Sequence, residues 1–207
     1  MMITDYQYFG SICFMELLYK EKEVFFDREA PFSKMSFKNR MVILSAQGPL
    51  HLTIPIIGGR DQKTAIKDIS IAYDAPWQAQ HWKAIKTCYK RAPYFEYYET
   101  DLENVYATKN EMLVDFLDNC HQFIKTAIKG KWQIVQQIDA NQENTLLAPQ
   151  HNQQVKVPWQ PNNFSTFTIQ HPYQQVFESS IGFIPNVSIL DWLFCCGGKV
   201  ISTQLSE

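Results

Sequence analysis

The segment Lys34-Met35-Ser36-Phe37-Lys38-Asn39-Arg40 is the first place in this chain that could bind an anion. It follows the apolar run Val24 to Phe26, which is typical of a buried strand, and ligands of α/β proteins collect at the carboxyl ends of strands. The side chains of Lys34 and Arg40, with the amide of Asn39 between them, suit a phosphate or a carboxylate. A solvated basic turn is the more common origin of such a charge run.

His81 is the histidine that could act as a general base, within the motif Trp77-x-x-x-His81-Trp82. It shares a predicted helix face with Trp77 and Ile85, so it points toward the core or toward a cleft wall. A neutral imidazole in a partly apolar cleft has a lowered pKa and can accept a proton near neutral pH. A satisfied structural histidine is the more frequent occupant of such a face.

A third cluster joins the segments 171–177 and 182–191, which contain Tyr173, Gln175 and Asp191. Asn186 or Ser188 could cap the helix that contains Asp191, and the start of that helix would offer free backbone N–H groups to an anion. The alternative, favoured by the apolar residues, is a capped terminal helix that packs into the core.

No metal-binding pattern and no phosphate-binding glycine pattern occur in the sequence. The histidines are scattered, without an H-x-x-x-H or H-x-H spacing, at positions 51, 81, 121, 151 and 171. The five cysteines lack a C-x-x-C spacing, so we expect reduced, structural thiols and a reducing compartment. The sequence specifies no cofactor and no oligomeric state.

The length of 207 residues suits a single compact domain over 1–207, and the 45% hydrophobic content is ample for a core. The formal net charge of −2 argues against a protein that coats nucleic acid. No apolar run reaches the roughly 18–20 residues of a membrane-spanning helix. The start lacks the basic and apolar regions of a signal peptide. We therefore expect a cytoplasmic protein without membrane insertion and without a nucleic-acid partner.

The predicted elements alternate between strand and helix in the first hundred residues. Apolar alternation and buried runs predict strands at 3–8, 24–27, 41–45, 50–56 and 66–72, with a hairpin turn at 46–49. Helical spacing predicts helices at 12–20, 77–92, 110–129 and 188–194. A Gln-, Asn- and Pro-rich excursion at about 136–163 carries one or two short strands, at 146–148 and 155–157. The expected architecture is α/β with a mixed sheet flanked by helices, and α+β is the alternative.

Seven segments across nearly the whole chain form a characteristic set when they are taken in order. They are Tyr8-Phe9-Gly10, Lys34-x-Ser36-x-x-Asn39-Arg40, Gly48 leading to Leu52-Thr53-Ile54-Pro55-Ile56, Trp77-x-x-x-His81-Trp82, Tyr89 before Ala92-Pro93-Tyr94-Phe95-Glu96-Tyr97-Tyr98, Tyr173-x-Gln175-Val176-Phe177, and Gly182-Phe183-Ile184-Pro185-Asn186-x-Ser188-Ile189-Leu190-Asp191-x-Leu193-Phe194. In this order they resemble the WbqC-like protein family, in the form common in Bacteroidetes. The resemblance depends on the set, because no single segment is specific.

The resemblance implies a role in O-antigen and related surface-polysaccharide biosynthesis, since the family takes its name from genes in such clusters. It implies a cytoplasmic transferase, for acyl or aminoacyl transfer to an amino-sugar nucleotide. A sugar nucleotide would then be the small-molecule substrate. This implication is associational and does not come from the residue pattern.

The resemblance also suggests roles for the candidate residues. Lys34 and Arg40 would hold the diphosphate, and Asn39 would orient it. His81 would remove a proton from the attacking amine or hydroxyl. Asp191 would orient a partner as the second catalytic residue, and the remaining pocket residues would be Tyr8, Tyr173 and Gln175.

The chain departs from the family pattern at three places, which is compatible with a divergent, weakened or retargeted site. Relatives usually have Pro where this chain has Ser11, Asn where it has Cys195, and Asp-Phe-Arg where it has Asn163-Phe164-Ser165. The lost Arg would be tolerable in a non-catalytic saccharide- or carrier-binding scaffold. The environment of His81 distinguishes the two functions: a solvent-reachable ring beside Lys34 and Arg40 favours catalysis, and a ring sealed under Trp77 and Trp82 favours the scaffold.

Overall fold

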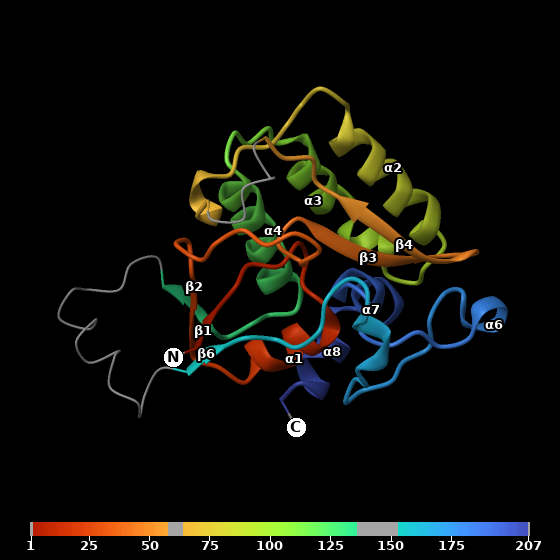
Figure 1. Cartoon of the computed structure of the whole chain (residues 1–207). Helices are drawn as coiled ribbons and strands as arrows, with labels where there is room; N and C mark the ends of the chain where they lie inside the picture. The colour runs from red at the N-terminus through yellow and green to blue at the C-terminus, as the bar shows by residue number, and fades with distance from the viewer. Residues whose placement is uncertain (1, 58–63, 136–152, 207) are drawn as a thin grey trace.

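Four short parallel strands form a sheet at one end of the computed structural model, which describes residues 2–57, 64–135 and 153–206 (Figure 1). The strands lie in the spatial order β5 (Gln133–Val135), β2 (Glu23–Phe26), β1 (Met2–Thr4) and β6 (Gln153–Val155). Met2 pairs with Val24 on one side and with Gln153 on the other. Val24 and Phe26 are buried at alternate positions, as expected of one face of a strand.

The strand order reverses direction at β1. From β1 the chain passes through α1 (Ile12–Tyr19) to β2, and β5 lies beyond β2, whereas β6 lies on the opposite side of β1. Such a reversal is a topological switch point, and ligands of open α/β sheets bind outside the carboxyl ends of the two strands that flank it. The carboxyl ends of β1 and β6 are therefore the positions at which this fold would present a ligand.

The second sheet is an antiparallel hairpin of β3 (Arg40–Ser45) and β4 (Gly48–Thr53). Gly48, the first residue of β4, follows the two-residue turn at Ala46 and Gln47 with a positive φ of +114°, which glycine adopts without strain. The apolar run Met41 to Leu44 is buried throughout, because both α2 and α7 contact β3.

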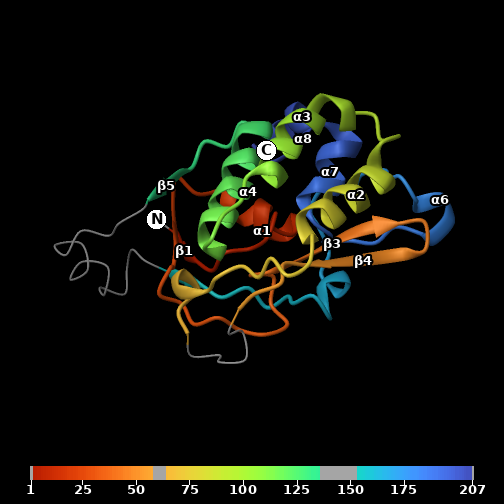
Figure 2. The same ribbon diagram turned by 90° about the horizontal axis from the view of Figure 1, so that it is seen from above.

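The helices pack together on one side of this hairpin, as Figure 2 shows. They are α2 (Trp77–Tyr89), α3 (Phe95–Ala107), α4 (Leu113–Ala127), α7 (Ile189–Cys196) and α8 (Gly198–Gln204), and a short α6 (Glu178–Ile181) lies apart from them. The buried face of α2 consists of Trp77, His81, Ile85 and Tyr89, at the four-residue spacing of a helix stripe. Every residue of α7 from Ile189 to Phe194 is buried, so α7 lies at the centre of the core.

The structure confirms an α/β fold in a single compact domain. Parallel and antiparallel pairing both occur, although in two separate sheets. Helices are present in all four predicted regions, and the predicted strands at 24–27, 41–45 and 50–56 correspond to β2, β3 and β4. The strand predicted at 155–157 is β6, two residues earlier, within the described part of the 136–163 excursion. The strand predicted at 146–148 lies outside the described residues.

One predicted strand was wrong, and one helix was not predicted. Residues 66–72 are not a strand: Ile66–Asp68 form the 3₁₀ turn η1, and only isolated bridges follow at Ser70 and Ile71. Ile66 and Ile69 are both buried, because residues three apart lie on the same side of a 3₁₀ turn. The helix α3 was not predicted, because its charged and tyrosine side chains conceal the buried stripe Phe95, Tyr98, Leu102 and Tyr106.

Within the described residues, no helix is both long and apolar enough to cross a membrane.

Candidate functional site

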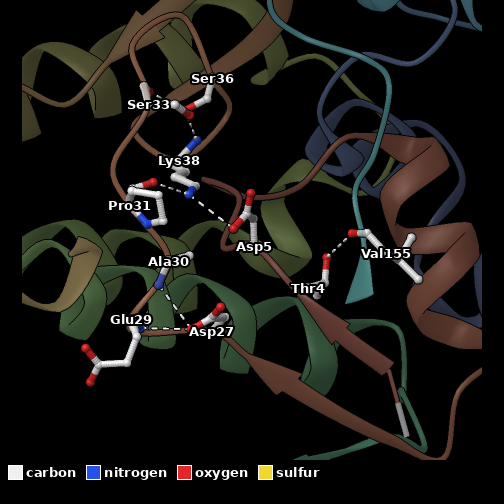
Figure 3. Close-up of polar contacts among 10 residues, drawn as sticks. All are labelled: Thr4, Asp5, Asp27, Glu29, Ala30, Pro31, Ser33, Ser36, Lys38 and Val155. Carbon is white, nitrogen blue, oxygen red and sulfur yellow. Dashed lines mark hydrogen bonds and ion pairs between the residues drawn. The ribbon is translucent and has the colours of Figure 1, made fainter. Parts of the chain in front are cut away.

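The carboxyl end of β1, at the switch point, carries an ion pair between Asp5 and Lys38 (Figure 3). Asp5 follows β1 directly, and Lys38 reaches it from the loop after β2 with an Nζ–Oδ1 distance of 3.1 Å. The ammonium also donates to the carbonyl of Pro31 at 2.8 Å. The Lys38 side chain is only 5% exposed whereas that of Asp5 is 46% exposed. The Lys38 ammonium is therefore buried, whereas the Asp5 carboxylate that pairs with it remains accessible to solvent.

Asp27, directly after β2, turns the chain so that this loop covers the sheet edge. Its Oδ1 accepts hydrogen bonds from the backbone N–H groups of Glu29, at 2.9 Å, and Ala30, at 3.0 Å (Figure 3). Such hydrogen bonds from a side chain to the backbone stabilise a sharp turn of the chain, because they satisfy backbone N–H groups that the turn leaves without a partner. The Phe37 carbonyl accepts from the Tyr8 N–H at 2.8 Å, so the far end of the loop is held against the segment after β1.

A second charged group at this edge consists of Arg28, Asp118 and Tyr6. Arg28 pairs with the Asp118 carboxylate of α4, and its Nε donates to the Tyr6 hydroxyl at 3.3 Å. The Tyr6 hydroxyl donates to Asp118 at 2.9 Å. Burial raises the pKa of Asp118, and the hydrogen bonds of Tyr6 and Arg28 oppose that rise. This group anchors α4 to the carboxyl edge of the sheet.

The predicted anion-binding residues Lys34, Asn39 and Arg40 do not act as one group, because the amide of Asn39 is turned into the interior. Lys34 is exposed on the loop. Asn39 is buried, and its Nδ2 donates to the carbonyl of Ile54 at 2.9 Å, so its amide holds the exit of β4. Arg40 is half-buried and directs Nη1 to the Met35 sulfur at 3.0 Å. Lys34 and Arg40 are the members of this set that solvent reaches.

Tyr8 and His81, which were both predicted, lie together in the core. The Tyr8 hydroxyl lies 3.0 Å from His81 Nδ1 and 2.5 Å from the Tyr106 hydroxyl. Burial lowers the pKa of His81 to about 4, and a hydrogen bond to the backbone of Thr53 opposes that shift. The imidazole is therefore neutral at physiological pH. The residue is 6% exposed, and its ring lies 5.2 Å edge-on from that of Trp77.

The sealed ring is the environment expected of the scaffold function. Trp82 does not cover His81, since it stacks on Phe95 and Tyr106 instead. The catalytic role of His81 stays a prediction, and its geometry favours the structural alternative.

The predicted residues Tyr173, Gln175 and Asp191 meet in a second buried cluster. The hydroxyls of Tyr173 and Tyr89 donate to the two carboxylate oxygens of Asp191, at 2.6 Å and 2.7 Å. Gln175 Nε2 donates to the Tyr173 hydroxyl at 3.3 Å. Asp191 is fully buried, and burial raises its pKa to about 6 against the opposing effect of the two tyrosines. The cluster joins α2, α7 and the segment before α6.

The start of α7 offers no free anion site, contrary to one expectation from the sequence. The Ile189 N–H donates to the carbonyl of Gly10 at 2.9 Å, and the Leu190 N–H donates to Ser188 Oγ at 3.4 Å. Ser188 therefore caps α7, as predicted. Asn186 caps α1 instead, where its Oδ1 accepts from the Cys13 N–H at 2.9 Å.

Asp5 and the inward orientation of Lys38 were not predicted from the sequence. One signal could have indicated the position of Asp5: an aspartate follows each of two neighbouring parallel strands, at Thr4-Asp5 and at Phe26-Asp27. In the described part of the chain, no group of three or more His, Cys, Asp or Glu side chains is placed to hold a metal ion.

Comparison with known proteins identifies one family. A model described as the WbqC-like protein family matches residues 7–157. This region includes Tyr8, the 34–40 loop and His81, whereas Tyr173, Gln175 and Asp191 lie beyond it. No curated protein and no solved structure matches the chain.

Proposed function

The chain belongs to the WbqC-like protein family, and from this premise we propose that it is a transferase for a nucleotide-activated amino sugar in surface-polysaccharide biosynthesis. The transferred group is an acyl or aminoacyl group. The substrate binds at the carboxyl edge of the parallel sheet, between β1 and β6.

One observation carries this proposal: a loop with several cations stands at the topological switch point of a parallel sheet. The loop is held there by the ion pair of Lys38 with Asp5 and by the Tyr8–Phe37 backbone hydrogen bond. Nucleotide phosphates are bound at this position in many parallel α/β sheets. The loop therefore brings positive charge to the part of the fold where a diphosphate would lie.

Each cation of the loop has a separate role in the proposal. Lys34 is exposed and Arg40 is half-exposed, so they are the groups that meet the diphosphate. Lys38 is already paired and buried, so it positions the loop and does not contact the substrate. Asn39 supports the same loop through Ile54.

A non-catalytic saccharide- or carrier-binding protein is the second candidate, and the burial of His81 favours it. Acyl transfer from a thioester donor to an amine breaks the C–S bond of the donor and forms an amide bond, and a general base passes the proton of the amine on to the departing thiolate. His81 is neutral but sealed by Tyr8 and Trp77. As a catalytic base it would require an opening of the α2 face.

Thermal melting with a panel of ligands tests the proposal. The panel contains UDP-N-acetylglucosamine, free UDP, coenzyme A and acetyl-coenzyme A. A ligand at about 100 times its Kd stabilises the fold by about 2.7 kcal/mol, which raises the Tm of a chain of this size by several degrees. We expect the nucleotide sugar to give this shift and the Lys34→Ala/Arg40→Ala variant to lose it.

The matched control is Lys90→Ala/Arg91→Ala, which removes an exposed lysine and arginine after α2. This control should keep the shift. If no ligand of the panel raises the Tm, the transferase proposal fails and the binding protein becomes the better candidate.

A further inference from the structure

A groove of 830 Å³ runs between α3, α4 and the start of α8, and it contains none of the predicted site residues. Figure 2 shows these three helices on the side of the molecule away from the β3–β4 hairpin. The volume of the groove lies within the range of roughly 300–1,000 Å³ that is typical of small-molecule binding sites. The residues that matter for recognition are Tyr97, Tyr98, Asp101, Asn104, Asn119 and Gln122.

Three tyrosines line the groove, Tyr94, Tyr97 and Tyr98, and the last two are in direct ring contact. Tyr97 is 79% exposed, an unusual state for a large ring, and its ring lies 4.8 Å from that of Tyr98 in an edge-on arrangement. The Tyr98 hydroxyl accepts a hydrogen bond from the Gly198 N–H at 2.8 Å, so this ring is held in place. Tyr97 therefore presents an open ring face beside a rigid one.

A row of polar side chains on α3 continues from these tyrosines. Asp101 is one turn beyond Tyr97, and Asn104 is nearly one turn further, so the three lie on the same helix face. The side chains of Asp101 and Asn104 make no hydrogen bond or ion pair within the described residues. Asn119 and Gln122 line the groove from α4 opposite. The groove thus combines an apolar ring face with amide and carboxylate groups that have capacity for further hydrogen bonds.

We infer that this groove binds a neutral saccharide. A pyranose has an apolar C–H face, which can pack on the ring of Tyr97, and a rim of hydroxyls, which amides and carboxylates bind. The charged residues of the groove have mixed sign, with Asp101 opposed by Lys129 and Lys199, so the groove offers no uniform field for a polyanion. The inference does not depend on the transferase proposal, because the groove shares no residue with the carboxyl edge.

Saturation-transfer-difference NMR on the full chain tests the inference. The probes are N-acetylglucosamine, N-acetylgalactosamine and maltotriose at about 10 mM, a concentration that fills most of a site with a Kd of about 1 mM. We expect saturation transfer to the ring protons of at least one probe. Tyr97→Ala should weaken that binding about tenfold or more, whereas Tyr97→Phe should keep it, because the ring face and not the hydroxyl makes the contact.

Phe183→Ala is the matched control, since Phe183 is an exposed aromatic residue that does not line the groove. It should bind the probe as the wild-type chain does. Lys34→Ala/Arg40→Ala should also keep saccharide binding, which separates this test from that of the transferase.

Three results would overturn the inference. The first is the absence of saturation transfer from all three probes. The second is transfer that Tyr97→Ala leaves unchanged. The third is a concentration-dependent dimer that Tyr97→Ala dissociates, because a second copy of the chain would then occupy the groove.

Discussion

The ammonium of Lys38 lies 3.1 Å from the carboxylate of Asp5, and this contact joins the loop after β2 to the end of β1. The two residues differ in exposure, since the Lys38 side chain is almost entirely buried and that of Asp5 is half-exposed. Loss of one partner therefore has a different consequence from loss of the other. A carboxylate left alone is solvated, whereas an ammonium left alone stays in the protein interior.

This asymmetry predicts the outcome of a double-mutant cycle. Asp5→Asn should lower the free energy of unfolding by about 1–3 kcal/mol, because it leaves a buried cation without a counter-charge. Lys38→Met should cost less, since the methionine fills the same space without a charge. The double variant should resemble Lys38→Met. Urea unfolding midpoints of the four proteins measure these differences, and additive effects of the two substitutions would show that the pair does not interact.

A second prediction concerns the protonation of His81. Burial lowers its pKa from 6.5 to about 4, so the folded state binds the proton more weakly than the unfolded chain does. The contribution of His81 to stability is therefore complete above pH 6.5 and is lost as the pH falls toward 4. An NMR titration of the ring proton resonances, with the chain in urea as the unfolded reference, should show a neutral His81 at pH 6. Protonation near pH 6.5 would instead indicate a solvent-reachable ring and would favour the catalytic role.

Local periodicity was sufficient to predict the helices that carry candidate residues. The stripe from Trp77 through His81 and Ile85 identified α2, because a helix buries residues four apart regardless of what covers them. The Ser188 cap was predictable for the same reason, since a cap bonds within its own first turn. These features depend only on neighbouring residues in the chain.

The arrangement of the candidate site depended on contacts that spacing does not contain. Lys34 and Lys38 are four residues apart in a loop, and the one that turns inward is the one that meets Asp5, 33 positions earlier. Asp191 was predicted on its helix, but its partner Tyr89 lies 102 positions away. The charge of a residue can be read from the sequence, whereas its burial depends on the tertiary fold.

A third prediction follows from the buried carboxyl of Asp191, whose pKa burial raises from 3.8 to about 6. The folded state binds this proton more tightly than the unfolded chain does, so the contribution to stability is complete below pH 3.8 and falls as the pH rises to 6. The difference in unfolding free energy between the wild-type chain and Asp191→Asn should fall across this window by on the order of 3 kcal/mol. Both proteins contain the same histidines, so the pH dependence that the histidines contribute cancels in this difference.

Urea unfolding at several pH values between 4 and 7 measures this difference. Asp115→Asn, an exposed position on α4, is the control and should follow the wild-type chain. Parallel curves for the wild-type chain and Asp191→Asn would show that the carboxyl of Asp191 has the same affinity for protons in both states.

The last prediction concerns Gly198, at the first position of α8. A Cβ on Gly198 would lie 1.8 Å from the carbonyl oxygen of Ala127 and 3.0 Å from the Tyr98 hydroxyl. Helix propensity alone favours alanine over glycine by about 1 kcal/mol, but a backbone oxygen at this distance cannot rotate away. Gly198→Ala should therefore displace α8 from α4 and lower the free energy of unfolding by about 2 kcal/mol or more. It should also reduce saccharide binding, because the displacement of α8 moves the backbone N–H at position 198 away from the Tyr98 hydroxyl that it holds.

Thr203→Ala, at an exposed position of the same helix, is the control and should change the free energy of unfolding by less than about 0.5 kcal/mol. A Gly198→Ala protein as stable as Thr203→Ala would contradict this prediction. It would mean that α8 can shift to accommodate the added methyl group and that the groove between α3, α4 and α8 is not rigid.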